Sequence, residues 1–63
     1  MRVSLEAMRV HRKMTQETVA SALNVSKKTV SRWENGVTMP DVNMVEPICS
    51  LYQCSYDDIE WTA

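Results

Sequence analysis

Hydrogen-bonding side chains recur at helical spacing in residues 27–35. At about 100° per residue, one side of the helix that this stretch predicts carries Lys28, Ser31, Arg32 and Asn35, with Lys27 and Thr29 at its edges. Val30 and Trp33 fall on the opposite side. Lys and Arg donate well to the O6 and N7 acceptors of guanine in the major groove of DNA. This face therefore favours contact with base edges, and it has no large apolar residue that would suggest a protein groove.

The residues before this face predict the elements that position it. Apolar residues in the stretch 16–23 predict a first helix, and the small Ala20 lets a second helix cross it closely. Asn24 fits the turn, because Asn adopts the left-handed conformation more readily than most residues. Ser26 is placed to accept a backbone N–H at the start of the second helix. Residues 16–35 therefore predict a helix-turn-helix.

The whole chain predicts an all-α fold, a compact bundle of five short helices in a single domain over residues 1–63. We expect the helices at about Ser4–Arg12, Gln16–Leu23, Lys27–Asn35, Asp41–Tyr52 and from Ser55 onward. The expected N-caps are Ser4, Thr15 and Ser26, and a capping box opens the last helix at Ser55. Gly36 is the expected stop of the third helix.

Pro47 lies inside the expected fourth helix, where its missing N–H and a steric clash disfavour helical structure. Either that helix is kinked, or it begins at Glu46 after a separate turn over residues 42–45. The second arrangement is favoured because proline is welcome at the first position of a helix.

Charge is divided unevenly along the chain, although the net charge is only −1. Residues 1–36 hold all seven basic residues and three acidic ones, a balance of +4. Residues 37–63 hold five acidic residues and no Lys or Arg, a balance of −5. This asymmetry predicts a basic side that faces nucleic acid and an acidic far side. We expect a modest non-specific affinity and a larger share from base contacts.

Motifs spread over most of the chain carry a resemblance to a known family. They are Met8-Arg9, Arg12, Met14-Thr15-Gln16-Glu17, Val19-Ala20, Leu23-Asn24-Val25-Ser26, Val30-Ser31, Trp33-Glu34-Asn35-Gly36, Pro40, Ile48, Leu51, Tyr52 and Ser55-Tyr56-Asp57-Asp58-Ile59. From about Leu5 to Ile59 the chain resembles the phage repressor and Cro-type helix-turn-helix domains, often called the XRE family. Asn24 departs from the glycine that is common in the family, and Pro47 departs from the expected fourth helix.

The resemblance implies sequence-specific binding of double-stranded DNA by a transcriptional regulator, a phage or bacterial repressor or Cro-like protein that occupies an operator. It assigns base contacts to Lys27, Lys28, Ser31 and Arg32. It assigns phosphate contacts, which fix register without reading sequence, to Thr15, Gln16, Asn35 and Thr38. Arg9 and Glu34 are expected to form an ion pair between helices. For each polar residue the simpler alternative is a solvated or capping role.

Aromatic and basic residues outside this set have expected roles of their own. Trp33 is expected to be the largest residue of the core. In the family the C-terminal part of the domain often supplies a dimer contact, so Trp61 either joins a weak homodimer, strengthened on DNA, or folds back onto its own core. A dimer would read two half-sites roughly 34 Å apart. Arg12, with its neighbours His11 and Lys13, is expected on a solvated surface.

The remaining composition favours a binding protein over an enzyme. Cys49 and Cys54 are expected to be free thiols, and two Cys with one His cannot complete a four-ligand zinc site. The chain shows no nucleophile–base pair and no phosphate-binding glycine loop, so we expect no catalysis, cofactor or small-molecule ligand. Neither a membrane span nor a secretory signal is apparent, which favours the cytoplasm of a bacterium or a phage-infected cell.

Three alternatives share the same pattern. The chain is the DNA-binding part of a longer repressor, or an antitoxin that regulates its own operon and uses the acidic half to bind a toxin, or a protein-binding module that keeps the fold without affinity for DNA.

Overall fold

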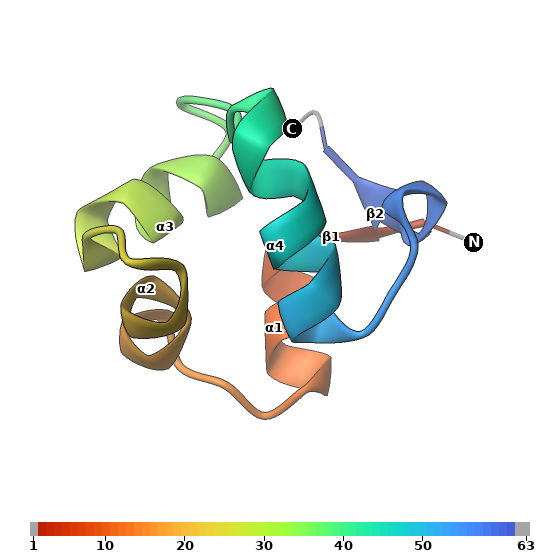
Figure 1. Ribbon diagram of the computed structural model, residues 1–63, viewed down its shortest axis with the longest axis horizontal. Coiled ribbons are helices and arrows are strands. Elements are labelled where there is room, and N and C mark those ends of the chain that lie inside the picture. Colours follow the sequence, from red (N-terminus) through yellow and green to blue (C-terminus); the bar gives the residue numbers. More distant parts are fainter. Residues whose placement is uncertain (1, 62–63) are drawn as a thin grey trace.

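Four α-helices and a short sheet make up the described part of the chain, residues 2–61 of the computed structural model. The helices are α1 (Leu5–His11), α2 (Gln16–Leu23), α3 (Lys27–Glu34) and α4 (Val42–Tyr52). A 3-10 turn, η1 (Tyr56–Asp58), and the strands β1 (Val3–Ser4) and β2 (Ile59–Glu60) complete the fold. Figure 1 shows α2 and α3 on one side of α1 and α4, with the strands on the other. The predicted compact helical bundle is confirmed in part: the fold is mostly helical, but it is not all-α, because β1 and β2 form a two-stranded sheet. Within residues 2–61 no helix has the length and apolarity that crossing a bilayer requires.

The predicted fifth helix is wrong, because the segment after Ser55 forms only the three-residue turn η1. Its capping box is present, and Ser55 N donates to Asp58 Oδ2 at 2.9 Å. The helix stops there because Ile59, only 1% exposed, is extended and pairs in parallel with Val3. Burial of Ile59 therefore outweighs helix propagation. Strands of two residues leave no alternating pattern by which a sequence could reveal them.

The three predicted N-caps of the first helices are confirmed. The side-chain oxygens of Ser4, Thr15 and Ser26 accept the backbone N–H three residues on, at 3.0, 3.0 and 3.1 Å. Each bond satisfies one of the N–H groups that the start of a helix leaves without a partner. At the other end, Gly36 follows α3 with a φ of 74°, as expected for a C-terminal stop.

Helix α4 runs without interruption through Pro47, so the favoured start at Glu46 is wrong. The proline is the sixth of the eleven residues of the helix and removes a single backbone hydrogen bond from its middle. Apolar side chains at Met44, Ile48 and Tyr52 recur every fourth residue on both sides of it and pack in or against the core. Their burial outweighs the lost hydrogen bond and the steric clash of the proline, which together cost about 3 kcal/mol inside a helix.

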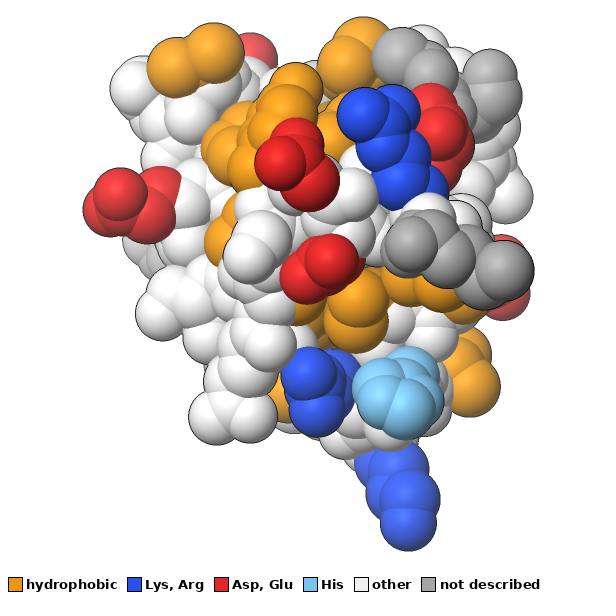
Figure 2. All heavy atoms as spheres, turned by 90° about the vertical axis from the view of Figure 1, so that its right-hand side faces the viewer, with side chains coloured by type: hydrophobic (Ala, Val, Ile, Leu, Met, Phe, Trp, Pro, Cys, Tyr) orange, Lys and Arg blue, Asp and Glu red, His pale blue; other side chains and the backbone are white. Residues whose placement is uncertain are grey.

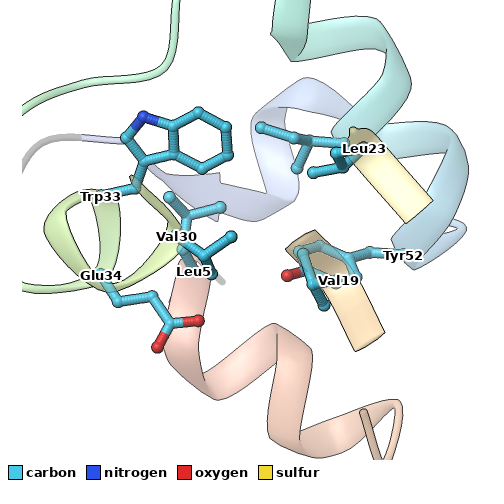
Figure 3. A pocket seen from close by; sticks show the side chains of 8 residues that line it. Leu5, Val19, Leu23, Val30, Trp33, Glu34 and Tyr52 are labelled. Atoms are coloured by element: carbon cyan, nitrogen blue, oxygen red, sulfur yellow. The ribbon is translucent and has the colours of Figure 1, made fainter. Parts of the chain in front are cut away.

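One hydrophobic core joins all four helices to β2, and its buried members are Leu5, Met8, Val19, Ala20, Val30, Ile48, Tyr52 and Ile59. Tyr52, 2% exposed, is the largest fully buried side chain. Trp33, expected to be the largest core residue, is only partly buried and packs against the core. A small void of about 10 Å³ remains among the side chains shown in Figure 3. A void of this size has room for about one water molecule at most.

Trp61 folds back onto its own chain, one of the two arrangements expected for it. Its ring stacks on Tyr56 with a centroid separation of 5.4 Å and an interplanar angle of 18°. Its Nε1 donates to the Tyr56 carbonyl oxygen at 2.9 Å. The indole is partly buried against the core, so it also helps to close the C-terminal side of the domain.

Arg12 has a structural role, so its expected place on a solvated surface is wrong. Its Nε donates to the Tyr52 carbonyl oxygen at 2.7 Å, and its Nη2 donates to that of Gln53 at 3.1 Å. These carbonyls belong to the end of α4, where the backbone acceptors of a helix lack partners and a cation is favourable. Arg12 therefore ties the end of α1 to the end of α4.

Replacing Arg12 by Ala should destabilise the domain, because it removes both hydrogen bonds to the end of α4. We expect a loss of about 2 kcal/mol in the free energy of unfolding and a fall in Tm of roughly 10 °C, measured by circular dichroism during heating. Lys28→Ala, which removes one exposed charge, is the matched control. Equal losses for the two variants would contradict the role given to Arg12.

Alkali should weaken the fold through Tyr52. Burial, and to a lesser degree the Glu34 carboxylate, raise the pKa of Tyr52 from 10.0 to about 12. Below pH 10 the phenol is neutral in the folded and the unfolded chain. Above it the unfolded chain loses the proton first, so the free energy of unfolding should fall by about 2–3 kcal/mol up to pH 12. Urea unfolding between pH 10 and pH 12 should show that the free energy of unfolding falls more steeply with pH in the wild type than in Tyr52→Phe. An equal fall in the two proteins would rule the effect out.

Candidate nucleic-acid interface

The turn between α2 and α3 has the geometry that the sequence predicted. Asn24 lies in the left-handed region at φ 59° and ψ 43°. Its N–H donates to the Ser21 carbonyl oxygen at 3.3 Å, and Val25 N donates to that of Ala20 at 2.9 Å. Ala20 is buried and Val25 packs against the core. The turn therefore closes the C-terminal end of α2 and delivers the chain to the start of α3.

The outward side of α3 carries the side chains expected to contact bases. Lys27, Lys28 and Arg32 are exposed, and within residues 2–61 they make no ion pair or side-chain hydrogen bond. Val30 lies on the opposite side of the helix and is buried. The donors of all three cations are therefore open to a partner outside the chain. We call Lys27, Lys28, Ser31, Arg32 and Asn35 the reading face.

Ser31 and Asn35 are joined on this face. Asn35 Nδ2 donates to Ser31 Oγ at 3.2 Å. Ser31 is partly buried and Asn35 is exposed. The bond leaves the Ser31 hydroxyl hydrogen available to an external acceptor, since the oxygen accepts from Asn35. A residue expected to touch bases is thus linked to one expected to touch phosphate.

An open hollow of about 440 Å³ lies where α2 begins, lined by Arg9, Thr15, Gln16, Glu17 and Lys27. Thr15 Oγ1 accepts from Thr18 N and donates to Thr18 Oγ1 at 2.9 Å, so its hydroxyl is occupied by capping. The N–H groups of the first helical turn, apart from the capped one, point out of the helix without helical acceptors. Together with the positive end of the helix they suit an oxygen anion, although the exposed Glu17 carboxylate opposes one.

A buried carboxylate behind the reading face holds three helices together. The Glu34 side chain is only 3% exposed. Arg9, expected to pair with it, donates from Nε to Oε2 at 2.7 Å and from Nη2 to Oε1 at 3.2 Å. Gln16 Nε2 adds a bond to Oε1 at 2.9 Å. The hydrogen bond to Glu34 raises the pKa of Arg9 above its ordinary value despite its burial, which keeps the guanidinium charged.

The sequence did not reveal that Gln16 belongs to this network. One amide hydrogen of Gln16 is used on Glu34, while its second amide hydrogen and its carbonyl oxygen make no hydrogen bond within residues 2–61. A glutamine that faces a buried glutamate 18 residues away leaves no local signal, because the two residues meet only through the crossing of α2 and α3.

The loop after α3 presents side chains outward and turns its backbone donors inward. Val37 N donates to the Arg32 carbonyl oxygen at 3.0 Å, and Thr38 N approaches the same oxygen at 3.5 Å. Thr38 itself is exposed. Any contact from this loop to an anion would therefore come from the side chains of Asn35 and Thr38 more readily than from these two backbone N–H groups.

The fold uses some of the basic residues and leaves others free. Arg2 pairs with Glu60 at 3.7 Å, Arg9 pairs with Glu34, and Arg12 binds carbonyl oxygens of the α4 end. The remaining cations are Lys13, Lys27, Lys28 and Arg32. Figure 2 shows the face on the side of the strands, away from α2 and α3, where acidic side chains lie among apolar and polar ones. Basic side chains appear there at the upper right and in the lower part. The free cations are thus concentrated on α3.

Loss of both partners of the Arg9–Glu34 pair should destabilise the domain by less than the sum of the two single losses. We expect Arg9→Met and Glu34→Leu to cost about 3 kcal/mol each, because each leaves a charge without its partner. The double variant should cost at least 2 kcal/mol less than their sum. Urea unfolding measures all three. Glu6→Gln is the control, since Glu6 is 63% exposed and lies 3.9 Å from Arg9, and it should cost less than about 1 kcal/mol. Simple additivity would contradict the pairing.

Comparisons with known proteins agree with this geometry. The family model described as helix-turn-helix matches residues 5–59, which include α1 to α4 and η1. The HTH-type transcriptional activator BcrR of Enterococcus faecalis is 29% identical over 55 residues. The match covers 87% of this chain and 27% of that protein, so the chain spans about a quarter of the relative's length. The chain belongs to the Cro/C1-type, or XRE, family of helix-turn-helix DNA-binding domains.

Proposed function

We propose that the chain binds double-stranded DNA in a sequence-specific manner and regulates transcription, with α3 lying in the major groove. The observation that carries the proposal is the reading face, on which Lys27, Lys28 and Arg32 have no partner in the described chain. A cation kept free on a rigid helix retains its donors for base edges, where Lys and Arg pair with guanine O6 and N7.

The proposed contacts divide into two groups. Base readout falls to Lys28, Ser31 and Arg32, and Lys27 contacts a base or the phosphate beside it. Phosphate contacts fall to Gln16, Asn35 and Thr38, and to Thr15 if its hydroxyl hydrogen turns from Thr18 to the phosphate. For Thr15 and Gln16 the support is the hollow at the start of α2, where the positive end of the helix favours a phosphate oxygen. For Asn35 and Thr38 it is the outward side chains of the α3 end and the following loop.

We further propose that two copies occupy an operator with two-fold symmetry. The supporting surface lies beside the stacked Tyr56 and Trp61 rings, where Met39 and Tyr56 are each 57% exposed. A hollow of about 180 Å³ opens between these side chains and Arg2. Apolar surface of this kind suits a second copy, and half-sites about 34 Å apart then place each α3 in the major groove on one side of the duplex.

The regulatory outcome we propose is repression by a phage or bacterial regulator that excludes polymerase from an operator. Repression by exclusion requires only the binding surface, whereas activation requires a further contact with the transcription machinery. The second candidate is activation, which is favoured by the similarity to a protein named as a transcriptional activator. The position of the operator relative to a promoter distinguishes the two.

Selection of binding sites from a random duplex library tests the proposal. The selection is run in parallel for the wild type and the Lys28→Ala/Arg32→Ala variant. The wild type should enrich a two-fold-symmetric motif. The variant should lose or relax defined positions, because each lost base contact costs about 1–3 kcal/mol. Lys13→Asn is the matched control: it removes a free cation outside the reading face, and asparagine tolerates the φ of 58° at this position.

The control should enrich the same motif as the wild type. Failure of the wild type to enrich any motif at low salt would overturn the DNA-binding proposal and direct the search to protein partners. A motif without symmetry, bound by one copy, would overturn the dimer alone.

A further inference from the structure

Two cysteines meet at the end of α4, away from the reading face. Cys49 lies in α4, and Cys54 lies in the turn that leads to η1. Both are free and partly buried. The two thiols affect each other's pKa, and the Cys54 thiol lowers the pKa of Cys49. Neither residue has a role in the contacts proposed for DNA.

The backbone holds the two residues at the spacing of a disulfide. Cys54 N donates to the Cys49 carbonyl oxygen at 3.0 Å. With standard bond lengths, a hydrogen bond of this length limits the Cα separation to about 7 Å at most. Disulfides span Cα separations of about 4.4–6.8 Å. The left-handed Gln53, at φ 53°, reverses the chain between them, and both cysteines line the same hollow.

The pair is accessible to small molecules in solution. An open hollow beside it is lined by Glu46, Ser50, Gln53 and Asp58 together with the two cysteines. Burial raises the pKa of both thiols, and at Cys49 the neighbouring Cys54 thiol opposes that rise. We therefore expect Cys49 to react first and Cys54, which lines the same hollow, to react second.

We propose that Cys49 and Cys54 are a modification site, a reversible dithiol–disulfide pair that is oxidised by low-molecular-weight disulfides of the glutathione class. The Cys49 thiolate attacks one sulfur of the oxidised disulfide, a mixed disulfide forms, and one small thiolate leaves. The Cys54 thiolate then attacks the Cys49 sulfur and expels the second small thiolate. The two protein thiols lose two electrons and two protons in total, and the small disulfide is reduced to two thiols.

The disulfide would restrain the turn at which α1, α4 and η1 meet. The turn that it closes contains Gln53, whose carbonyl oxygen accepts from Arg12, and Tyr52 lies immediately before it. The reading face lies on α3, and in Figure 1 α3 is separated by α4 from the turn that leads to η1. Oxidation is therefore expected to change the stability of the domain and to leave base readout intact. This inference stands independently of the proposed function.

The test compares disulfide formation in the native and the unfolded chain. The reduced full chain is equilibrated with mixtures of reduced and oxidised glutathione, in native buffer and in guanidinium chloride. Thiols are then blocked by alkylation and counted by mass spectrometry. The equilibrium constant for the intramolecular disulfide should be at least about tenfold higher in native buffer. By linkage the oxidised chain should also melt roughly 5–10 °C higher than the reduced chain.

Variants separate the two steps. Cys54→Ser should accumulate the mixed disulfide with glutathione on Cys49, and Cys49→Ser should react more slowly at Cys54, with circular dichroism confirming that both variants fold. An equilibrium constant that is lower in native buffer than in guanidinium chloride would overturn the proposal, and so would wild-type protein that forms only mixed or intermolecular disulfides. Binding to duplex DNA is not part of the readout, so failure here leaves the proposed function untouched.

Discussion

The domain depends on one buried carboxylate that must be compensated. Glu34 is the last residue of α3, and its side chain lies on the inner side of the helix with almost no exposure to water. An unpaired charge there would cost several kcal/mol. Two bonds from Arg9 and one from Gln16 meet this requirement, and they come from α1 and α2. The reading face can be regular and exposed because the opposite side of α3 is fixed by this network and by the buried Val30.

The same requirement separates the cations into two kinds. Arg9 and Arg12 use their planar, multi-donor groups on acceptors within the fold, where several N–H bonds with fixed directions are needed. Lys27 and Lys28 have no such acceptors and stay in solvent. Most acidic residues follow α3 in the chain, so a protein with a slightly negative net charge still presents a positive helix. The net charge alone would wrongly argue against a nucleic-acid partner, because it hides how the charges are distributed.

Features set by neighbours in the chain could be predicted from the sequence, and features set by distant contacts could not. The caps at Ser4, Thr15 and Ser26 and the turn at Asn24 are local, because each side chain acts on backbone within three or four residues. The pairing of Arg9 with Glu34 was expected only by resemblance to a family. The roles of Arg12 and Gln16, the continuity of α4 through Pro47, and the strands at both ends all depend on packing between segments far apart in sequence. The contacts of the reading face with DNA remain predictions.

The β1–β2 pair has a consequence for the order in which the domain assembles. Val3 and Ile59 are partners although almost the entire chain lies between them. Joining two ends that are so distant costs loop-closure entropy, which intervening helices reduce by shortening the span. The strand pair is therefore expected to close late in folding and to open early in unfolding. The α2–turn–α3 unit, whose contacts are local, can form first, so the region that the DNA would meet is also the part of the chain that commits earliest to its native shape.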